Sequence, residues 1–162
     1  MRRKKNKILS TGGFSLIELL VVMAIIGILA STATYSYSVA RIQARDAMRV
    51  GHIATITRAL AMYANDNSGL YPNPATECLS DSGVGADLIS NETIRSVPTD
   101  PLWPADAPSD VSAGGWVEEP SSDFCYFYSS DDGTDFYLSY YLERNSDYSS
   151  AGINIRGPAG LY

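Results

Sequence analysis

The segment that decides the fold of this chain reads Gly12-Gly13-Phe14-Ser15-Leu16-Ile17-Glu18. It joins a basic leader to an apolar run that continues to residue 40, in which Glu18 is the single charged residue. A carboxylate inside the hydrocarbon core of a bilayer costs about 2–4 kcal/mol, so residues of this kind usually serve a function. The sequence therefore predicts a specific role for Glu18.

The apolar run has the length of a transmembrane helix. Residues 14–34 supply about 20 apolar positions, which at a rise of about 1.5 Å per residue cross the hydrocarbon core. The leader holds five basic residues that, by the positive-inside rule, keep the N-terminus in the cytoplasm: Arg2, Arg3, Lys4, Lys5 and Lys7. A secretory signal peptide cleaved near residues 30–33 is the alternative, but its apolar region would span only about 7–15 residues. We therefore predict a leader over residues 1–13 and a transmembrane helix over residues 14–40.

Residues 41–66 are expected to continue this helix as an amphipathic segment. They contain no proline, and apolar residues recur at the three- and four-residue steps of one helix face: Val50, Ile53, Ile56, Leu60 and Tyr63. Arg45, Arg49 and Arg58 are expected away from that face. The run Asn65-Asp66-Asn67-Ser68-Gly69 predicts the end of the helix, and Pro72 prevents its resumption.

Residues 67–162 have the composition of loops and short strands, because all eight prolines of the chain lie there. Residues 124–129 and 136–143 flank an Asp-Gly turn and predict a β-hairpin, one face of which would pack against helix residues 50–64. A short helix is expected over residues 88–94. Residues 145–162 are rich in Asn, Ser and Gly, and we expect them to form a loose tail.

Charge and cysteine content limit the partners and the compartment of this outer part. Residues 65–162 hold 16 acidic and three basic residues, so we expect no nucleic-acid binding through them. Cys78 and Cys125 are the two cysteines of the chain, and we predict that they form a disulfide in an oxidising compartment. Two thiols alone are too few for a structural zinc site.

The sequence offers little support for catalysis. No nucleophile–base pair, phosphate-binding loop or metal cluster is visible in it. His52, the single histidine, lies in the amphipathic segment and is expected to be a surface or packed residue. We therefore predict that the protein is not an enzyme.

Residues 13–20 and 24–30 resemble the N-terminus of type IV pilins and type II secretion pseudopilins. A glycine at the cut, Phe14 after it and Glu18 four residues further carry the resemblance. It implies an α+β, type IV pilin-like fold, in which a long N-terminal helix, part membrane-spanning and part amphipathic, packs on a small antiparallel β-sheet. It also implies that a prepilin peptidase cleaves between Gly13 and Phe14 and that Phe14 is then N-methylated.

The resemblance assigns Glu18 to subunit assembly. Cleavage frees an α-amine at Phe14, and Glu18 would pair with the Phe14 amine of a neighbouring subunit. Two alternatives remain. Glu18 could pair with the Phe14 amine of its own chain, four residues away on the helix. It could also be a carboxylate tolerated near the helix end by the helix dipole and by snorkelling to the interface. In this family the implied partners are identical and related pilin-like subunits, an inner-membrane assembly platform, and membrane lipid before assembly.

Further segments are similar to the major pseudopilin of type II secretion, the G type. They are residues 60–67, Tyr71-Pro72, Val97-Pro98-Thr99-Asp100-Pro101 and the strand at 136–143. One departure is Tyr35, which stands where pilins usually carry a proline. G-type pseudopilins bind calcium in a C-terminal loop, which makes calcium one reading of Asp131, Asp132 and Asp135; an Asp-Gly hairpin turn explains the same residues without a metal.

These features together lead to one expectation of function and location. The chain would be a structural subunit of a type IV pilin-like filament, preferably a secretion pseudopilin. It would be a single-pass protein of the inner membrane, with residues 67–162 outside the cytoplasm. The alternatives are a subunit of a type IV or competence pilus and, more remotely, a membrane-anchored binding domain.

Overall fold

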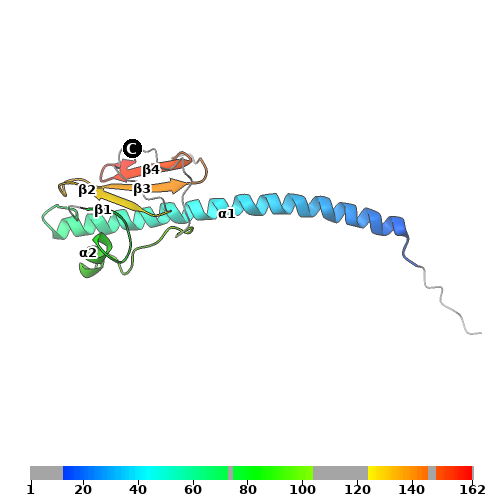
Figure 1. Ribbon diagram of the computed structural model, residues 1–162, viewed down its shortest axis with the longest axis horizontal. Helices are drawn as coiled ribbons and strands as arrows, with labels where there is room; N and C mark the ends of the chain where they lie inside the picture. The colour runs from blue at the N-terminus through cyan, green and yellow to red at the C-terminus, as the bar shows by residue number, and fades with distance from the viewer. Residues whose placement is uncertain (1–12, 73–74, 104–123, 146–148, 162) are drawn as a thin grey trace, which may run out of the picture. The chain divides into compact units, whose positions relative to one another are not determined.

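The computed structural model describes residues 13–72, 75–103, 124–145 and 149–161 (Figure 1). The chain divides into two compact units, residues 1–40 and residues 41–162.

Helix α1 runs over Leu16–Asp66, 51 residues, and its first part, with residues 13–15 before it, makes up the described portion of the first unit. Large apolar side chains from Leu16 to Leu29 are exposed on every side of this part. It is the one described helix that is long and apolar enough to cross a membrane. Such an all-round apolar surface suits lipid as the surrounding medium.

The end of α1 lies where the sequence predicts it. The helix ends at Asp66, and the backbone N–H of Gly69 donates to the Ala64 carbonyl at 2.7 Å. Gly69 has a φ of 85°, a left-handed conformation that glycine adopts without a Cβ penalty. The loop that follows is fixed to the sheet, because the Tyr71 N–H donates to the Gly133 carbonyl at 2.8 Å.

The second unit contains an antiparallel sheet of five strands in the order β1-β2-β3-β4-β5 (Figure 1). The strands are β1 Ala75–Cys78, β2 Phe127–Ser130, β3 Tyr137–Leu142, β4 Gly152–Gly157 and β5 Gly160–Leu161. A short helix, α2, spans Val84–Ser90 between β1 and β2. The hairpin predicted from the Asp-Gly turn is confirmed, with β2 and β3 paired from Phe127↔Ser139 to Ser129↔Tyr137.

Two other expectations for this unit are wrong. The C-terminal stretch is not a loose tail, because β4 pairs with β3 over five residues and β5 pairs with β4. Its Gly and Asn content masked the alternation of Ile153 and Ile155 around Asn154. The short helix lies earlier than expected, since α2 starts at Val84 rather than at Leu88.

The core lies between the outer part of α1 and one face of the sheet. Alternate side chains of β3 are buried: Leu138, Tyr140 and Leu142. They belong to the same hydrophobic core as Ile53 and Leu60 of α1. The predicted fold class is therefore confirmed: the chain is α+β, with a long N-terminal helix packed on a small antiparallel sheet, a type IV pilin-like arrangement.

The buried face of α1 differs from the expected one at its first turn. Ile53, Ile56 and Leu60 are buried as predicted, but Val50 is 48% exposed and Arg49 is fully buried. Arg49 stands four residues before Ile53 and so belongs to the same face. Because arginine is charged, the sequence did not indicate that Arg49 belongs to the buried face. Arg49 can be buried because several carboxylates surround its guanidinium.

Candidate functional site

The predicted processing segment lies before the first helical turn. Gly13, Phe14 and Ser15 are not helical, and α1 begins at Leu16. The Phe14 side chain is 80% exposed. The peptide bond between Gly13 and Phe14 is therefore in non-helical, exposed chain, which is the form in which a peptidase can bind a substrate backbone.

Glu18 caps the start of α1. The backbone N–H of Ser15 donates to Oε2 of Glu18 at 3.0 Å, and the Leu19 N–H donates to the Ser15 carbonyl at 3.3 Å. This is the bond that the third helical residue makes in a capping box, where Glu or Gln reaches back to the N-cap amide. The Ser15-x-x-Glu18 spacing of a capping box is present in the sequence, but it is missed when this segment is read only as an apolar run. The cap gives Glu18 a partner within its own chain.

The same carboxylate is placed for a second partner. Glu18 is four residues after Phe14 and stands in the first turn of α1, where the helix dipole favours a negative charge. A carboxylate has two oxygens and about four acceptor positions, and the Ser15 amide uses one of them. An ammonium group near this turn could therefore bind Glu18 without the cap being lost.

The two cysteines form a disulfide in the second unit. Cys78 ends β1, and Cys125 lies just before β2, with 5.7 Å between their Cα atoms. β1 and β2 are also paired directly, from Ala75↔Ser130 to Cys78↔Phe127. The disulfide thus closes the long connection between two strands that already form a ladder.

The acidic turn between β2 and β3 is organised by its own hydrogen bonds. Oδ1 of Asp132 accepts from the backbone N–H of Thr134 at 2.9 Å and from its hydroxyl at 2.6 Å, and these bonds lower the pKa of Asp132. Gly133 has a φ of 79°. Asp131 and Asp135 are exposed, and the described residues contain no group of three or more His, Cys, Asp or Glu placed to hold a metal ion. The geometry supports the turn reading of these aspartates.

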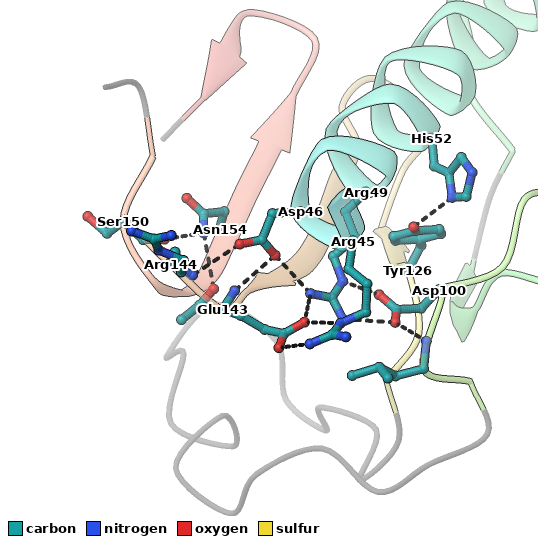
Figure 2. Close-up of polar contacts among 12 residues, drawn as sticks. Arg45, Asp46, Arg49, His52, Asp100, Tyr126, Glu143, Arg144, Ser150 and Asn154 are labelled. Carbon is teal, nitrogen blue, oxygen red and sulfur yellow. Dashed lines mark hydrogen bonds and ion pairs between the residues drawn. The ribbon is translucent and has the colours of Figure 1, made fainter. Parts of the chain in front are cut away.

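A partly buried charge cluster, which the sequence did not suggest, joins α1 to two other segments (Figure 2). Arg49 donates through Nε and Nη2 to the two carboxylate oxygens of Asp100 at 2.7 and 3.1 Å. Its Nη1 donates to Asp46 at 2.9 Å and to Glu143 at 2.8 Å. Arg45 adds two bonds to Glu143, at 2.7 and 2.6 Å. We call Arg45, Asp46, Arg49, Asp100 and Glu143 the charge cluster.

The hydrogen bonds of the charge cluster favour the charged forms of Arg49 and Glu143. Burial alone lowers the pKa of Arg49, but hydrogen bonds and attraction from Asp100, followed by bonds to Glu143 and Asp46, raise it overall. Bonds from Arg45 and then Arg49 hold the pKa of Glu143 below its usual 4.5, although partial burial opposes them. Asp100 comes from the Val97–Pro101 segment noted in the sequence, and this contact gives that segment a structural role.

His52 has a packing role. Its Nδ1 lies 2.8 Å from the Tyr126 hydroxyl, and the two rings meet edge to face (Figure 2). Tyr126 is buried, and burial raises the pKa of its hydroxyl, so the phenol remains protonated. The prediction that His52 is a surface or packed residue agrees with this contact.

The structure thus separates the predicted site residues into distinct places. Gly13, Phe14 and Glu18 lie together at the start of α1 in the first unit. The disulfide and the acidic turn belong to the second unit.

Comparison with protein families gives a match at the N-terminus. Residues 10–34 match the prokaryotic N-terminal methylation motif, which is of the prepilin type. The match contains the Gly13–Phe14 bond, Glu18 and most of the apolar run. Comparisons with curated proteins and with solved structures give no match.

Proposed function

We propose that this chain is a structural subunit of a type II secretion pseudopilus. The N-terminal methylation motif supports a type IV pilin-like subunit, which is a structural component of a filament and not an enzyme. The observation that carries the proposal is the position of Glu18 within that motif, at the N-terminus of an apolar helix and four residues after the cleavage point.

In the proposed mechanism, processing creates the partner of Glu18. Cleavage by prepilin peptidase after Gly13 removes residues 1–13 and leaves an ammonium group on Phe14, which is then N-methylated. In a medium of low dielectric constant, an ammonium and a carboxylate attract strongly, and either group alone would be costly. Glu18 of one subunit would bind the Phe14 amine of its neighbour and so set the axial position between subunits.

Lipid is the proposed surrounding before assembly. The helix of residues 14–40 would cross the inner membrane with the leader in the cytoplasm, and residues 41–162 would lie outside the cytoplasm. Exchanging lipid for neighbouring helices brings no hydrophobic gain, so side-chain packing and the Glu18 pair would have to supply specificity. The platform that extracts the subunit would act on this anchored form.

The choice of secretion pseudopilin over surface pilus rests on the sequence segments similar to the G type. In the second unit, Tyr71 packs on Phe136 with ring centroids 4.7 Å apart, and Asp100 binds Arg49. The Tyr71-Pro72 segment and the segment of residues 97–101 therefore both contribute contacts within the folded domain, which supports reading them as features of a G-type domain. The alternative function is a subunit of a type IV or competence pilus.

Mass spectrometry of the native N-terminus tests the proposal. We expect a mature chain that begins with N-methylated Phe14. An unprocessed Met1, or an N-terminus after residue 30, would contradict it and would favour a membrane-anchored binding domain or a secreted protein.

A variant tests the role of Glu18. We expect Glu18→Ala to insert into the membrane and to be absent from filaments, because the neighbour's amine has lost its partner. Membrane fractionation measures the first property, and the content of sheared filaments measures the second. Wild-type incorporation of this variant would refute the assembly role.

A further inference from the structure

Two tyrosines follow the apolar run of α1 at the place where a membrane-spanning helix leaves the hydrocarbon. From Phe14 to Thr34 the chain contains no tyrosine, and then Tyr35 and Tyr37 appear within three residues. Both side chains project from the helix, 73% and 65% exposed. After Glu18, the next charged residue along the sequence is Arg41.

The length of the run places these tyrosines at a bilayer surface. Phe14 to Thr34 is 21 residues. At about 1.5 Å per residue it spans roughly 31 Å, and a hydrocarbon core is about 30 Å thick. When Phe14 lies at one surface of the core, Tyr35 and Tyr37 reach the other.

The hydroxyl residues before Tyr35 do not need water. Ser31, Thr32 and Thr34 each donate to a backbone carbonyl one turn earlier, at 2.8, 2.9 and 2.9 Å. A polar group that is hydrogen-bonded within its own helix costs far less in hydrocarbon than an unsatisfied one. Residues 31–34 can therefore remain inside the core, and the surface falls at Tyr35 and not at Ser31.

The directions of the two rings distinguish a lipid surface from a single protein partner. Residues two apart on an α-helix point about 200° from each other, so Tyr35 and Tyr37 lie on opposite sides of α1. A neighbouring chain that packs along one side of the helix would contact one ring. A membrane surface surrounds the helix and contacts both at the same depth.

We infer that Tyr35 and Tyr37 form an interfacial anchor that binds the phospholipid headgroup region on the side of the membrane opposite the basic leader. Each ring packs on acyl chains, and each hydroxyl faces the ester and phosphate groups, which is the preferred environment of tyrosine in membranes. The anchor sets the depth of α1 in the bilayer before any assembly. The inference requires that the helix spans a membrane, and it does not depend on filament formation.

The depth of the two positions can be measured in vesicles. Tyr35→Trp, Tyr37→Trp and Ile28→Trp are each made in the full-length chain, in which Trp103→Phe and Trp116→Phe remove the two native tryptophans, and the fluorescence of the new tryptophan is excited selectively. Each protein is reconstituted into phosphatidylethanolamine–phosphatidylglycerol vesicles whose lipids carry bromine either near the headgroup or near the chain end. Ile28, 66% exposed and inside the run seven residues before Tyr35, is the matched control.

We expect headgroup-proximal bromine to quench the variants at positions 35 and 37 more strongly than deep bromine does. The order should be reversed for Ile28→Trp. Quenching at only one of the two tyrosine positions, at neither, or with the depth of the Ile28 control would overturn the inference. Flotation with the vesicles confirms that each variant is inserted.

Protein density separates lipid from a second copy of the chain. The measurement is repeated at a high and a low protein-to-lipid ratio. Unchanged quenching supports the anchor, whereas quenching that appears only on dilution means that copies of the chain cover the tyrosines and overturns it. Since the precursor is used throughout, a failure here leaves the filament proposal intact, and a failure of filament assembly leaves this result intact.

Discussion

Arg49 shows how one residue can reverse the expected character of a helix face. It is fully buried, and its guanidinium donates four hydrogen bonds to carboxylates: two to Asp100, one to Asp46 and one to Glu143. The guanidinium also lies 5.4 Å from the centroid of the Phe124 ring. Such a complete set of partners is what allows a charge to lie in a core.

Removal of this cation should be strongly destabilising. Arg49→Met leaves Asp100, whose side chain is 2% exposed, as a buried charge without its main partner. We expect a loss of about 3–5 kcal/mol in the free energy of unfolding, measured by urea titration of the full chain in detergent. Arg49→Met with Asp100→Leu is the matched control and should recover part of the loss. A single variant as stable as the wild type would show that the cluster contributes nothing to stability.

Glu18 has two candidate roles that one substitution separates. Gln at this position keeps an oxygen for the Ser15 amide, so Glu18→Gln should preserve the cap and remove the charge. We expect this variant to insert and to be cleaved normally, but to be absent from filaments. Ser15→Ala, which retains the backbone N–H, is the control and should assemble. Normal assembly of Glu18→Gln would mean that capping alone explains the residue.

At the scale of elements, the sequence predicted correctly those helices and strands that are marked by regular apolar spacing or by a glycine turn. The length of α1 and its end near Gly69 followed from apolar spacing and a glycine stop, and the β2–β3 hairpin followed from an Asp-Gly turn. β4 was missed because Gly152, Asn154 and Gly157 resemble a loop. The burial of Arg49 was missed because it depends on Asp100, which is 51 residues away in the sequence. The Glu18 cap was missed because its partner is the backbone N–H of Ser15 and not a side chain.

Removal of the disulfide tests how much it stabilises the domain and whether β1 and β2 stay paired without it. It links residues 47 apart in sequence. Loop-closure entropy assigns such a crosslink about 4 kcal/mol of stability. We expect Cys78→Ser with Cys125→Ser to lower the midpoint of urea unfolding, while the far-ultraviolet circular dichroism spectrum stays unchanged because β1 and β2 remain paired. Wild-type protein with reductant should match the variant, and loss of the strand signal in both would contradict this account.

At the scale of the whole molecule, stability depends on pH through the ion pairs of Glu143 with Arg45 and Arg49. Glu143 has a pKa below its usual 4.5 in the folded chain because Arg45 and Arg49 bind its charged form. A carboxylate of this kind stabilises the fold above its unfolded pKa. That contribution is lost as pH falls through the lower folded value.

We therefore expect a stability plateau near neutral pH and a fall in melting temperature once pH drops below about 4.5, the usual value for a glutamate. Glu143→Gln should melt at a lower temperature at pH 7 and should show a shallower decline in acid. Melting in detergent at several pH values measures both curves. Parallel declines in the two proteins would show that other carboxylates, and not Glu143, determine the acid limit.

The sheet of the second unit has short strands at both of its sides. β1 has four residues and β5 has two, and they are the outer strands of the described sheet. Long, open edges let the backbones of neighbouring chains join into one continuous sheet, and short edges prevent it. On the β1 side, four residues leave little backbone for another copy to join, whereas β5 covers β4 only at Arg156 and Gly157, so in the described sheet residues 152–155 of β4 form the edge at which a further strand would add.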